Sequence, residues 1–383
     1  ASRLLGEPVN ANDHVNCGQS SNDIIPTTIH VSAALALHEQ LLPALLHLVQ
    51  VIEQKAGQVH HHVKTGRTHL MDAMPVRMSQ VLNGWAQQLK ANISHLQDLL
   101  PSLQSLAQGG TAVGTGINAH PEFAARFSRH LSQLADVQFT PGKDLFALIG
   151  SQDTAVAVSG QLKATAVSLM KIANDLRWMN SGPLAGLGEI ELEALQPGSS
   201  IMPGKVNPVI PEVVNQTCFY VIGQDLTVTM AAEAGQLQLN VMEPVIAFAM
   251  FTSLDYLSNA IQTLIDKCIN GITANVDHCY NMVMNSIGIV TQLNPIIGYE
   301  ESASIAGEAL KTNKSVHQIA VLERKLITQE KWDEIPLNNV LGYPFHDELS
   351  AISPNNPVLL RHASGHAVFA NERAMKEAGI SKE

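Results

Sequence analysis

The chain has 383 residues, of which 45% are hydrophobic, 15% charged and only 4% aromatic, and its formal net charge at pH 7 is −11. This length suits two or three domains with a large buried core, because domains average roughly 150 residues. The acidic charge excludes a protein built to bind nucleic acid or an anionic membrane, since both need a basic face. Four cysteines without CxxC spacing predict neither a disulfide framework nor a zinc site, and they favour a reducing, cytoplasmic location.

Hydrophobic residues recur at helical spacing along most of the chain. The first long helix is expected after Gly18–Asp23, with a Ser or Asn cap and with apolar residues on one face from Ile29 to Ile52. Pro26 fits the first turn of this helix, and Pro43 should kink it. Four more long helices are expected at about 76–107, 153–180, 208–234 and 244–270.

Helices of this length, roughly 40 to 50 Å, suit a long bundle whose flanks are covered by other subunits. Alternating strand patterns are scarce, so the predicted fold class is all-α. No uninterrupted apolar run of about 18 residues and no signal peptide is visible, and we therefore expect no membrane partner. Short helices are expected at 303–311 and 316–324, and a last helical stretch at 367–378.

The segment from Gly198 to Pro208 reads GSSIMPGKVNP and could carry chemistry. Its composition is as typical of a plain interhelical loop as of a binding site. A nucleotide-binding P-loop is excluded, because five residues separate Gly198 from Gly204 and Val206 follows the lysine. The functional alternative is an anion site, in which Lys205 and Asn207 hold a carboxylate and a serine hydroxyl reaches the same carbon skeleton.

These eleven residues resemble the signature of the fumarase/aspartase superfamily almost letter for letter. Further blocks of that family stand in the expected order, namely QSSND at 19–23, GRTHL at 66–70, GGTAVGTG at 109–116 and SLMKIAND at 168–175. The resemblance covers about residues 1–340. It implies a homotetramer with a twenty-helix core and active sites assembled from three subunits. The implied reaction is reversible anti elimination across a small four-carbon dicarboxylate, with no metal and no organic cofactor.

The resemblance also implies roles for individual residues. It makes Ser199 the base that removes a proton, and this proton is weakly acidic because it lies next to a carboxylate. The site must then stabilise a doubly charged aci-carboxylate, and Lys205 and Asn207 can supply that field. His69 is implied to contact substrate or water and to pair with Glu212, which favours the imidazolium form. The other implied substrate ligands are Ser20, Ser21, Asn22, Thr68, Ser200 and Val206.

Two branches of the family leave traces in the chain. Fumarase-like blocks stand at 20–22, 109–113 and 171–178, whereas aspartase-like blocks stand at 213–216, 233–244 and 268–275. Because the visible site residues lie in the fumarase-like part, the predicted activity is that of a fumarate hydratase, and aspartate ammonia-lyase is the alternative. A second alternative is a catalytically silent structural relative, such as a δ-crystallin, or an inactive truncated fragment. The intact signature loop argues against a silent relative.

The resemblance predicts a remnant of an N-terminal domain at 1–19, a central bundle at 20–274, a small helical domain at 275–340 and an atypical tail at 341–383. A family segment with Gly-Ser-Gly-Thr hydroxyls does not occur in this chain. The accessory anion site of fumarases would fall at Asn10, Ala11, Asn12 and Asp13, but Asn10 and Ala11 replace the usual His and Pro. The tail resembles a piece of an amidohydrolase-type metal enzyme, yet a lone His-x-x-x-His pair predicts no metal site.

Overall fold

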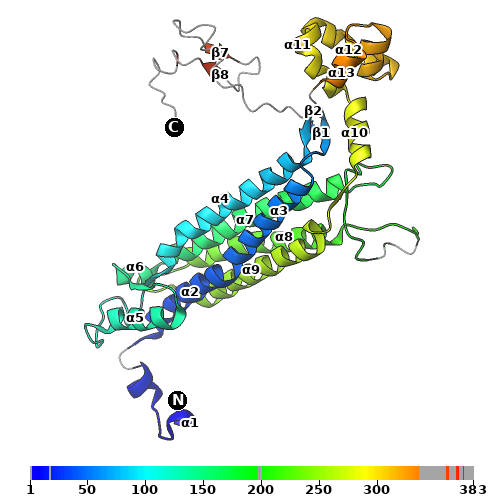
Figure 1. Cartoon of the computed structure of the whole chain (residues 1–383). Helices are drawn as coiled ribbons and strands as arrows, with labels where there is room; N and C mark the ends of the chain where they lie inside the picture. The colour runs from blue at the N-terminus through cyan, green and yellow to red at the C-terminus, as the bar shows by residue number, and fades with distance from the viewer. Residues whose placement is uncertain are drawn as a thin grey trace. The chain divides into compact units, whose positions relative to one another are not determined.

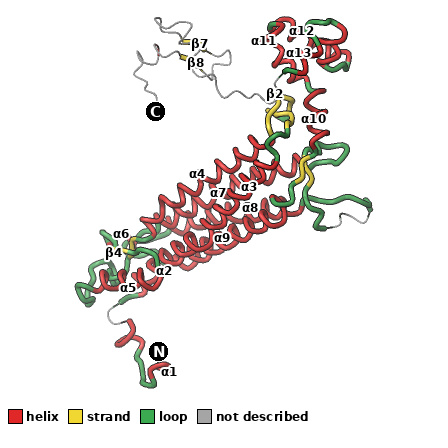
Figure 2. Tube along the Cα trace, in the orientation of Figure 1, coloured by secondary structure: helices red, strands yellow, loops and turns green. Residues whose placement is uncertain are grey.

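The computed structural model describes residues 2–16, 19–196, 198, 201–335, 359–361, 368–370 and 374. The chain divides into two compact units, Ala1–Val316 and His317–Glu383. The first unit is dominated by a bundle of long helices that lie side by side (Figure 1). The described residues are mostly helical, with only short two-stranded pairs (Figure 2), and the all-α prediction is confirmed.

The five predicted long helices are present, and their ends lie within a few residues of the predicted ones. In chain order the bundle contains α2 (Ser21–Ala36) with α3 (Leu42–Gln58), α4 (Met78–Leu103), α7 (Asp153–Met179), α8 (Val209–Glu233) and α9 (Glu243–Leu264). A π-helical turn, η3 (Ile265–Ile269), extends α9. Fully buried leucines from these helices, such as Leu45, Leu89, Leu169 and Leu257, fill the core between them.

The first of these helices begins with a capping box. The Ser20 side chain accepts from the Asn22 N–H, and the Asp23 side chain accepts from the Ser20 N–H. The irregularity expected at Pro43 is a π-helical turn, η2 (Leu37–Leu41), which ends two residues before it. The helix is otherwise continuous over 38 residues from Ser21 to Gln58. At 1.5 Å per residue, this segment is about 57 Å long.

The segment Ser21–Gln58 is also long and apolar enough, by length and composition, to cross a membrane. However, Leu37, Leu41 and Leu45 have no exposed surface and lie in the core of the bundle. Apolar residues buried in this way are what a core helix of a bundle requires, so the composition of the segment is explained by packing.

A β-hairpin precedes α4, where no strand was predicted. It consists of β1 (Val63–Thr68) and β2 (Met71–Arg77), so the helix expected from residue 76 begins two residues later. The register shifts between Thr65 and Arg67, and a Cβ on the intervening Gly66 would lie 2.5 Å from the Met74 carbonyl oxygen. Only glycine fits this bulge.

Shorter elements flank the bundle. At the N-terminus lie α1 (Ser2–Leu5) and the π-helical turn η1 (Ala11–Asn16), and beside the start of α2 lie β3 (Ser105–Leu106), α5 (Phe123–Ala135), β4 (Thr140–Pro141) and α6 (Leu145–Gly150). Near the hairpin lie β5 (Ile190–Glu191), β6 (Thr273–Ala274), α10 (Val276–Asn285), η4 (Ile287–Leu293), α11 (Asn294–Ile297) and α12 (Tyr299–Thr312) (Figure 1).

The second unit contains η5 (Gln318–Glu323), α13 (Gln329–Asp333) and an antiparallel pair, β7 (Leu359–Arg361) with β8 (Val368–Ala370). The helix predicted at 367–378 is therefore wrong over 368–370, where a β-branched and an aromatic residue favour a strand. Most of the tail lies outside the described residues, and its resemblance to an amidohydrolase fragment stays a prediction.

Candidate active site

The turn of the hairpin carries two of the predicted site residues. Thr68 ends β1, and His69 and Leu70 form the two-residue turn with φ angles of 55° and 61°. Two successive left-handed residues define a type I′ turn, which normally uses Asn-Gly or Gly-Gly. Left-handed conformations cost non-glycine residues about 1 kcal/mol or more and are found where the surrounding structure enforces them. His69 is thus held exposed at a strained position.

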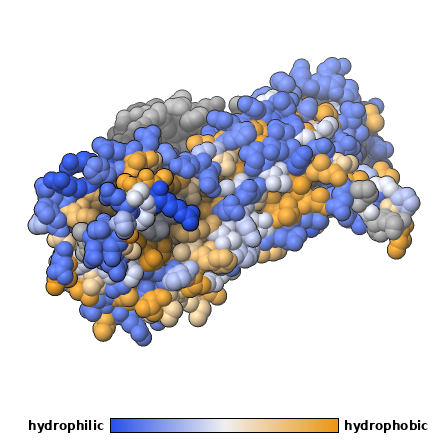
Figure 3. All heavy atoms as spheres, turned by 90° about the horizontal axis from the view of Figure 1, so that it is seen from below, coloured by the Kyte–Doolittle hydropathy of each residue, from blue (hydrophilic) through white to orange (hydrophobic). Residues whose placement is uncertain are grey.

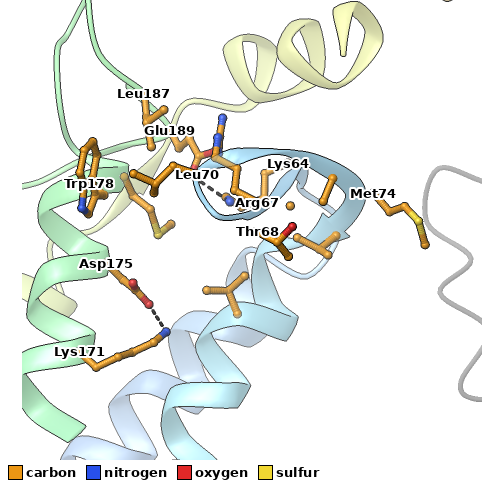
Figure 4. A pocket seen from close by; sticks show the side chains of 15 residues that line it. Lys64, Arg67, Thr68, Leu70, Met74, Lys171, Asp175, Trp178, Leu187 and Glu189 are labelled. Carbon is orange, nitrogen blue, oxygen red and sulfur yellow. Dashed lines mark hydrogen bonds and ion pairs between the residues drawn. The ribbon is translucent and has the colours of Figure 1, made fainter. Parts of the chain in front are cut away.

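A buried ion-pair cluster fixes the base of this hairpin. The Glu189 side chain has no exposed surface, and its carboxylate pairs with Lys64 Nζ at 3.1 Å and with Arg67 Nη1 (Figure 4). Arg67 also donates to the Thr65 carbonyl at 3.3 Å. Buried charges are stable only when paired, so Glu189 holds both cations of β1 in place.

Cys279 lies against the same cluster, and its Sγ is 3.5 Å from the Glu189 carbonyl oxygen. Burial, followed by the nearby Glu189 charge, raises the pKa of this thiol to about 11. A thiol with such a pKa stays neutral and unreactive at physiological pH. Cys279 is therefore a packing residue beside the hairpin, not a nucleophile.

A cavity of about 530 Å³ lies beneath the hairpin and is lined by Thr68 together with the ends of α4 and α7. Lys171 and Asp175 of α7 form an ion pair on its wall (Figure 4). The Asp175 carboxylate also accepts from Trp85 Nε1 at 3.1 Å. Most of the remaining wall is apolar, including Trp178. The structure thus places Thr68 at the rim of a pocket whose charges are already paired.

A second cavity, of about 490 Å³, collects the described part of the signature loop. Lys205, Val206 and Asn207 line it together with Glu212, which lies in the first turn of α8. A Cβ on Gly198 would collide with the Lys205 backbone, so the loop closes tightly on itself and requires glycine there. The structure therefore brings together four of the predicted site residues. Ser199 and Ser200 lie outside the described residues.

Arg177 is the described ionic partner of Glu212. Its Nη2 lies 3.9 Å from Glu212 Oε1, and its Nη1 donates to Asn174 Oδ1 at 3.3 Å. The same Asn174 oxygen accepts from Asn215 Nδ2 at 2.8 Å, which fixes the arginine between α7 and α8. Among the described residues of this one chain, Glu212 has no ion pair with His69, and their predicted pairing is not seen within a subunit.

The third predicted group lies at the start of α2. Ser20 caps the helix, Ser21 is exposed, and Asn22 Nδ2 donates to the Ala112 carbonyl at 2.8 Å. This contact joins the group to the glycine-rich loop 109–116. It lies at the end of the bundle opposite the hairpin (Figure 1).

At the predicted accessory site, the Asn10 side chain accepts from the backbone N–H groups of Asn12 and Asp13 at 2.8 and 3.0 Å. Together with Ala11, these residues form an exposed turn that opens η1. The side-chain oxygen of Asn10 is therefore used within the turn itself. Among the described residues, no group of three or more His, Cys, Asp or Glu side chains is placed to hold a metal ion.

Sequence reasoning assigned no role to several residues that shape these sites. Lys64, Arg67 and Glu189 anchor the hairpin, Asp23 joins α2 to the glycine-rich loop, and Arg177 pairs with Glu212. Arg67 and Asp23 stand inside the GRTHL and QSSND blocks, so the signal was present. Their partners lie far along the chain, and only the fold identifies them.

The structure is a long helical bundle with predicted site residues near both of its ends. Residues 1–223 match the family described as Lyase, and residues 289–341 match the family described as Fumarase C C-terminus. The chain belongs to the fumarase/aspartase superfamily of lyases.

Named relatives come from both branches. The chain is 61% identical over 321 residues to a protein named fumarate hydratase class II 2 from Pseudomonas aeruginosa, with 84% of this chain and 70% of that protein covered. It is 49% identical over 324 residues to an aspartate ammonia-lyase from Helicobacter pylori, with 85% of this chain and 69% of that protein covered.

Solved structures show the same architecture. The class II fumarase from Schistosoma mansoni matches with a TM-score of 0.82 and 36% identity, over 93% of this chain and 76% of that chain. A fumarate lyase:delta crystallin from Brucella melitensis in native form matches with a TM-score of 0.77 and 40% identity, over 84% of this chain and 71% of that chain. Both likenesses confirm the helical-bundle fold of the described residues.

Proposed function

We propose that this chain is a class II fumarate hydratase, which interconverts fumarate and L-malate by reversible anti addition and elimination of water. The observation that carries this proposal is the 61% identity to a protein with that name across 84% of the chain. The relatives named aspartate ammonia-lyase stand lower, at 49%. The cavity around Lys205 and Asn207 has the donors that a dicarboxylate requires.

In the proposed mechanism, Ser199 acts as an alkoxide and takes the proton from the carbon next to a substrate carboxylate. The developing charge spreads onto that carboxylate, and the Lys205 ammonium with the Asn207 amide stabilises the resulting aci-carboxylate. Ser200 and Val206 contact the same end of the substrate. The C2 hydroxyl takes a proton from His69, which we propose to pair with Glu212 of a different subunit, and leaves as water on the opposite face.

The signature-loop cavity carries charges of both signs. Lys205 and Arg177 line it together with Glu212, Glu191 and Glu193. Glu212 is paired with Arg177, which leaves Lys205, Glu191 and Glu193 as the remaining charges of the wall. Because carboxylates outnumber cations there, the wall does not favour the malate dianion over aspartate, and the choice of L-malate rests on the identity to the fumarate hydratase.

We further propose that the active site is shared between subunits of a homotetramer. Asn22 lies in the first turn of a segment about 57 Å long and Thr68 lies ten residues past its other end, so a single subunit cannot place both on one small substrate. One face of α8 also exposes large apolar side chains, with Phe219, Leu226 and Met230 between 58% and 64% exposed. Figure 3 shows apolar side chains gathered on the surface of the bundle. Such a face is covered by another copy of the chain.

No organic cofactor, nucleic acid or membrane takes part in the proposed reaction, and we place the enzyme in the cytoplasm. Cys218, Cys268 and Cys279 support this location, because all three are free and buried. Free thiols of this kind are typical of proteins from reducing compartments.

The proposed activity is tested by following the absorbance of fumarate with L-malate and L-aspartate as separate substrates. Faster release of fumarate from L-malate is expected, because the chain is 61% identical to a fumarate hydratase and 49% identical to the aspartate ammonia-lyases. Faster release from L-aspartate would overturn the hydratase assignment in favour of the ammonia-lyase. No release from either substrate by the assembled protein would indicate a catalytically silent relative.

A further inference from the structure

Asp23 is a completely buried carboxylate that joins two segments of the candidate site. Its Oδ1 accepts from the Ser20 N–H at 3.1 Å. Its Oδ2 accepts from Gln108 Nε2 at 3.2 Å, from the Gly109 N–H at 3.0 Å and from the Thr111 N–H at 2.8 Å. Within the described part of the chain, all of these partners are neutral donors. The negative charge is therefore stabilised by backbone and side-chain amide N–H groups that converge on the carboxylate.

The loop that surrounds Asp23 is strained. Thr111 has a φ of 58°, a left-handed conformation that is a marked outlier for a β-branched residue. Its side chain is 3% exposed, and its hydroxyl has no hydrogen-bond partner among the described residues. Both features cost free energy, so the surrounding structure must enforce this conformation. The bond from the Thr111 N–H to Asp23 is the contact made by the strained residue itself, and hydrogen bonds from the Gly114 and Gly116 N–H groups to the Gly110 carbonyl close the same loop.

The same loop contacts the predicted substrate ligands directly. Asn22 Nδ2 donates to the carbonyl of Ala112, the residue after Thr111, at 2.8 Å. The Ser20 hydroxyl accepts from the Asn22 N–H at 3.2 Å, which leaves its hydrogen free to donate. Ser21 remains exposed. Asp23 and the loop thus hold the backbone of these three residues. The Ser20 hydroxyl and the second Asn22 amide hydrogen stay available as donors, and the Ser21 hydroxyl donates to Asn22 Oδ1 at 3.5 Å.

We propose that Asp23 is a positioning residue, which clamps the Gln108–Thr111 loop to the start of α2 and so holds Ser20, Ser21 and Asn22 in the geometry that binds the substrate. This inference rests on the proposed function, because it takes these three residues to be substrate ligands. Saturation of the Asp23 oxygens by N–H donors also keeps its charge away from the dianionic substrate. Asp23 itself does not touch the substrate.

The first test is the substitution Asp23→Asn in the assembled enzyme. The amide places an NH2 group against N–H donors, so at least one clamp bond is lost without a change in volume. We expect the KM for L-malate to rise about tenfold or more while kcat changes by less than about threefold, because binding in ground and transition states is lost together. Asp136→Asn is the matched control, because Asp136 is exposed and has a φ of 52°, a conformation that asparagine also adopts. The KM of this control variant for L-malate should not change.

The second test is rescue by Thr111→Gly. Glycine adopts the left-handed conformation without strain, so the loop can keep its shape when the clamp is weakened. The double variant Asp23→Asn with Thr111→Gly should recover at least about half of the lost binding free energy, and Thr111→Gly alone should leave KM within about twofold of wild type. An absence of rescue, or a loss confined to kcat, would overturn the positioning role.

A third measurement separates this inference from the proposed function. Amide hydrogen exchange in Asp23→Asn should accelerate at residues 20–22 and 109–116 and remain unchanged in α8, whatever the substrate is. Unchanged exchange in the loop would refute the clamp even in an active fumarate hydratase. If Asp23→Asn does not assemble, Gln108→Met removes one neutral donor at similar volume. Its faster exchange in the same loop would support the clamp, and unchanged exchange would refute it.

Discussion

Asn22 lies at the start of one continuous helix and Thr68 in the hairpin that follows its other end, although both are proposed to bind the same substrate. This helix is about 57 Å long, many times the length of a four-carbon dicarboxylate. Lys205 and Asn207, in contrast, line one cavity of a single chain. A complete site therefore takes some of its residues from different subunits and some from the same subunit.

This arrangement predicts complementation between inactive chains. The Asn22→Ala and Thr68→Val variants should each have low activity when expressed alone. When the two chains are co-expressed and mix at random, about one quarter of the sites receive both native residues and should be active. The matched control is co-expression of Lys205→Met with Asn207→Ala, which should restore nothing. Specific activity of the purified mixed oligomers measures both, and equal recovery in the two experiments would contradict the shared site.

Ser199→Ala should nearly abolish turnover and leave assembly intact. A loop hydroxyl contributes chemistry and little packing, and the loss of a catalytic base lowers the rate by about 10² to 10⁴-fold. Turnover is followed by fumarate absorbance, and assembly by sedimentation. Activity within a few-fold of wild type would rule out Ser199 as the base.

Glu189→Gln should loosen the hairpin that carries Thr68 and His69. The change leaves Lys64 and Arg67, which are 8% and 13% exposed, without their buried counter-charge. Breaking a buried ion pair in this way costs about 3 to 5 kcal/mol, measured here as a lower free energy of unfolding. Glu53→Gln is the control, because its pair with Lys90 is 43% and 47% exposed and should contribute less than about 1 kcal/mol. Similar losses of unfolding free energy in the two variants would contradict the larger contribution expected from the buried Glu189 ion pairs.

Glu243 should make stability depend on pH. Burial raises the pKa of this carboxyl from its ordinary 4.5 to about 7. Between these values the folded chain binds one more proton than the unfolded chain, so the free energy of unfolding falls as pH rises from about 4.5 to 7. The decrease should reach up to about 3 kcal/mol per subunit and then level off.

Glu243→Gln tests this dependence, since the glutamine amide cannot ionise. Melting curves from pH 5 to pH 8 should show the wild type losing stability relative to this variant. Glu233→Gln serves as the control on an exposed residue of α8 and should follow the wild type. A constant difference between Glu243→Gln and wild type across this pH range would contradict the shifted pKa.

The sequence by itself determined the bundle and the family. Helical periodicity and end signals are local, so the bounds of α7 and α8 could be predicted to within two residues, and the cap at Ser20 follows from its own neighbours. The signature from Gly198 to Pro208 likewise needs no partner to be recognised. These features depend on residues within one or two turns of each other.

Only the tertiary structure decided how the sites are held. The hairpin has His69 and Leu70 in a turn that normally uses glycine, and Glu189, 122 residues from Arg67, stabilises its base. Asp23 meets the Gly109 N–H across 86 residues in the same way. Local sequence patterns do not encode such pairs, because the free energy that favours each conformation comes from a group brought close by folding.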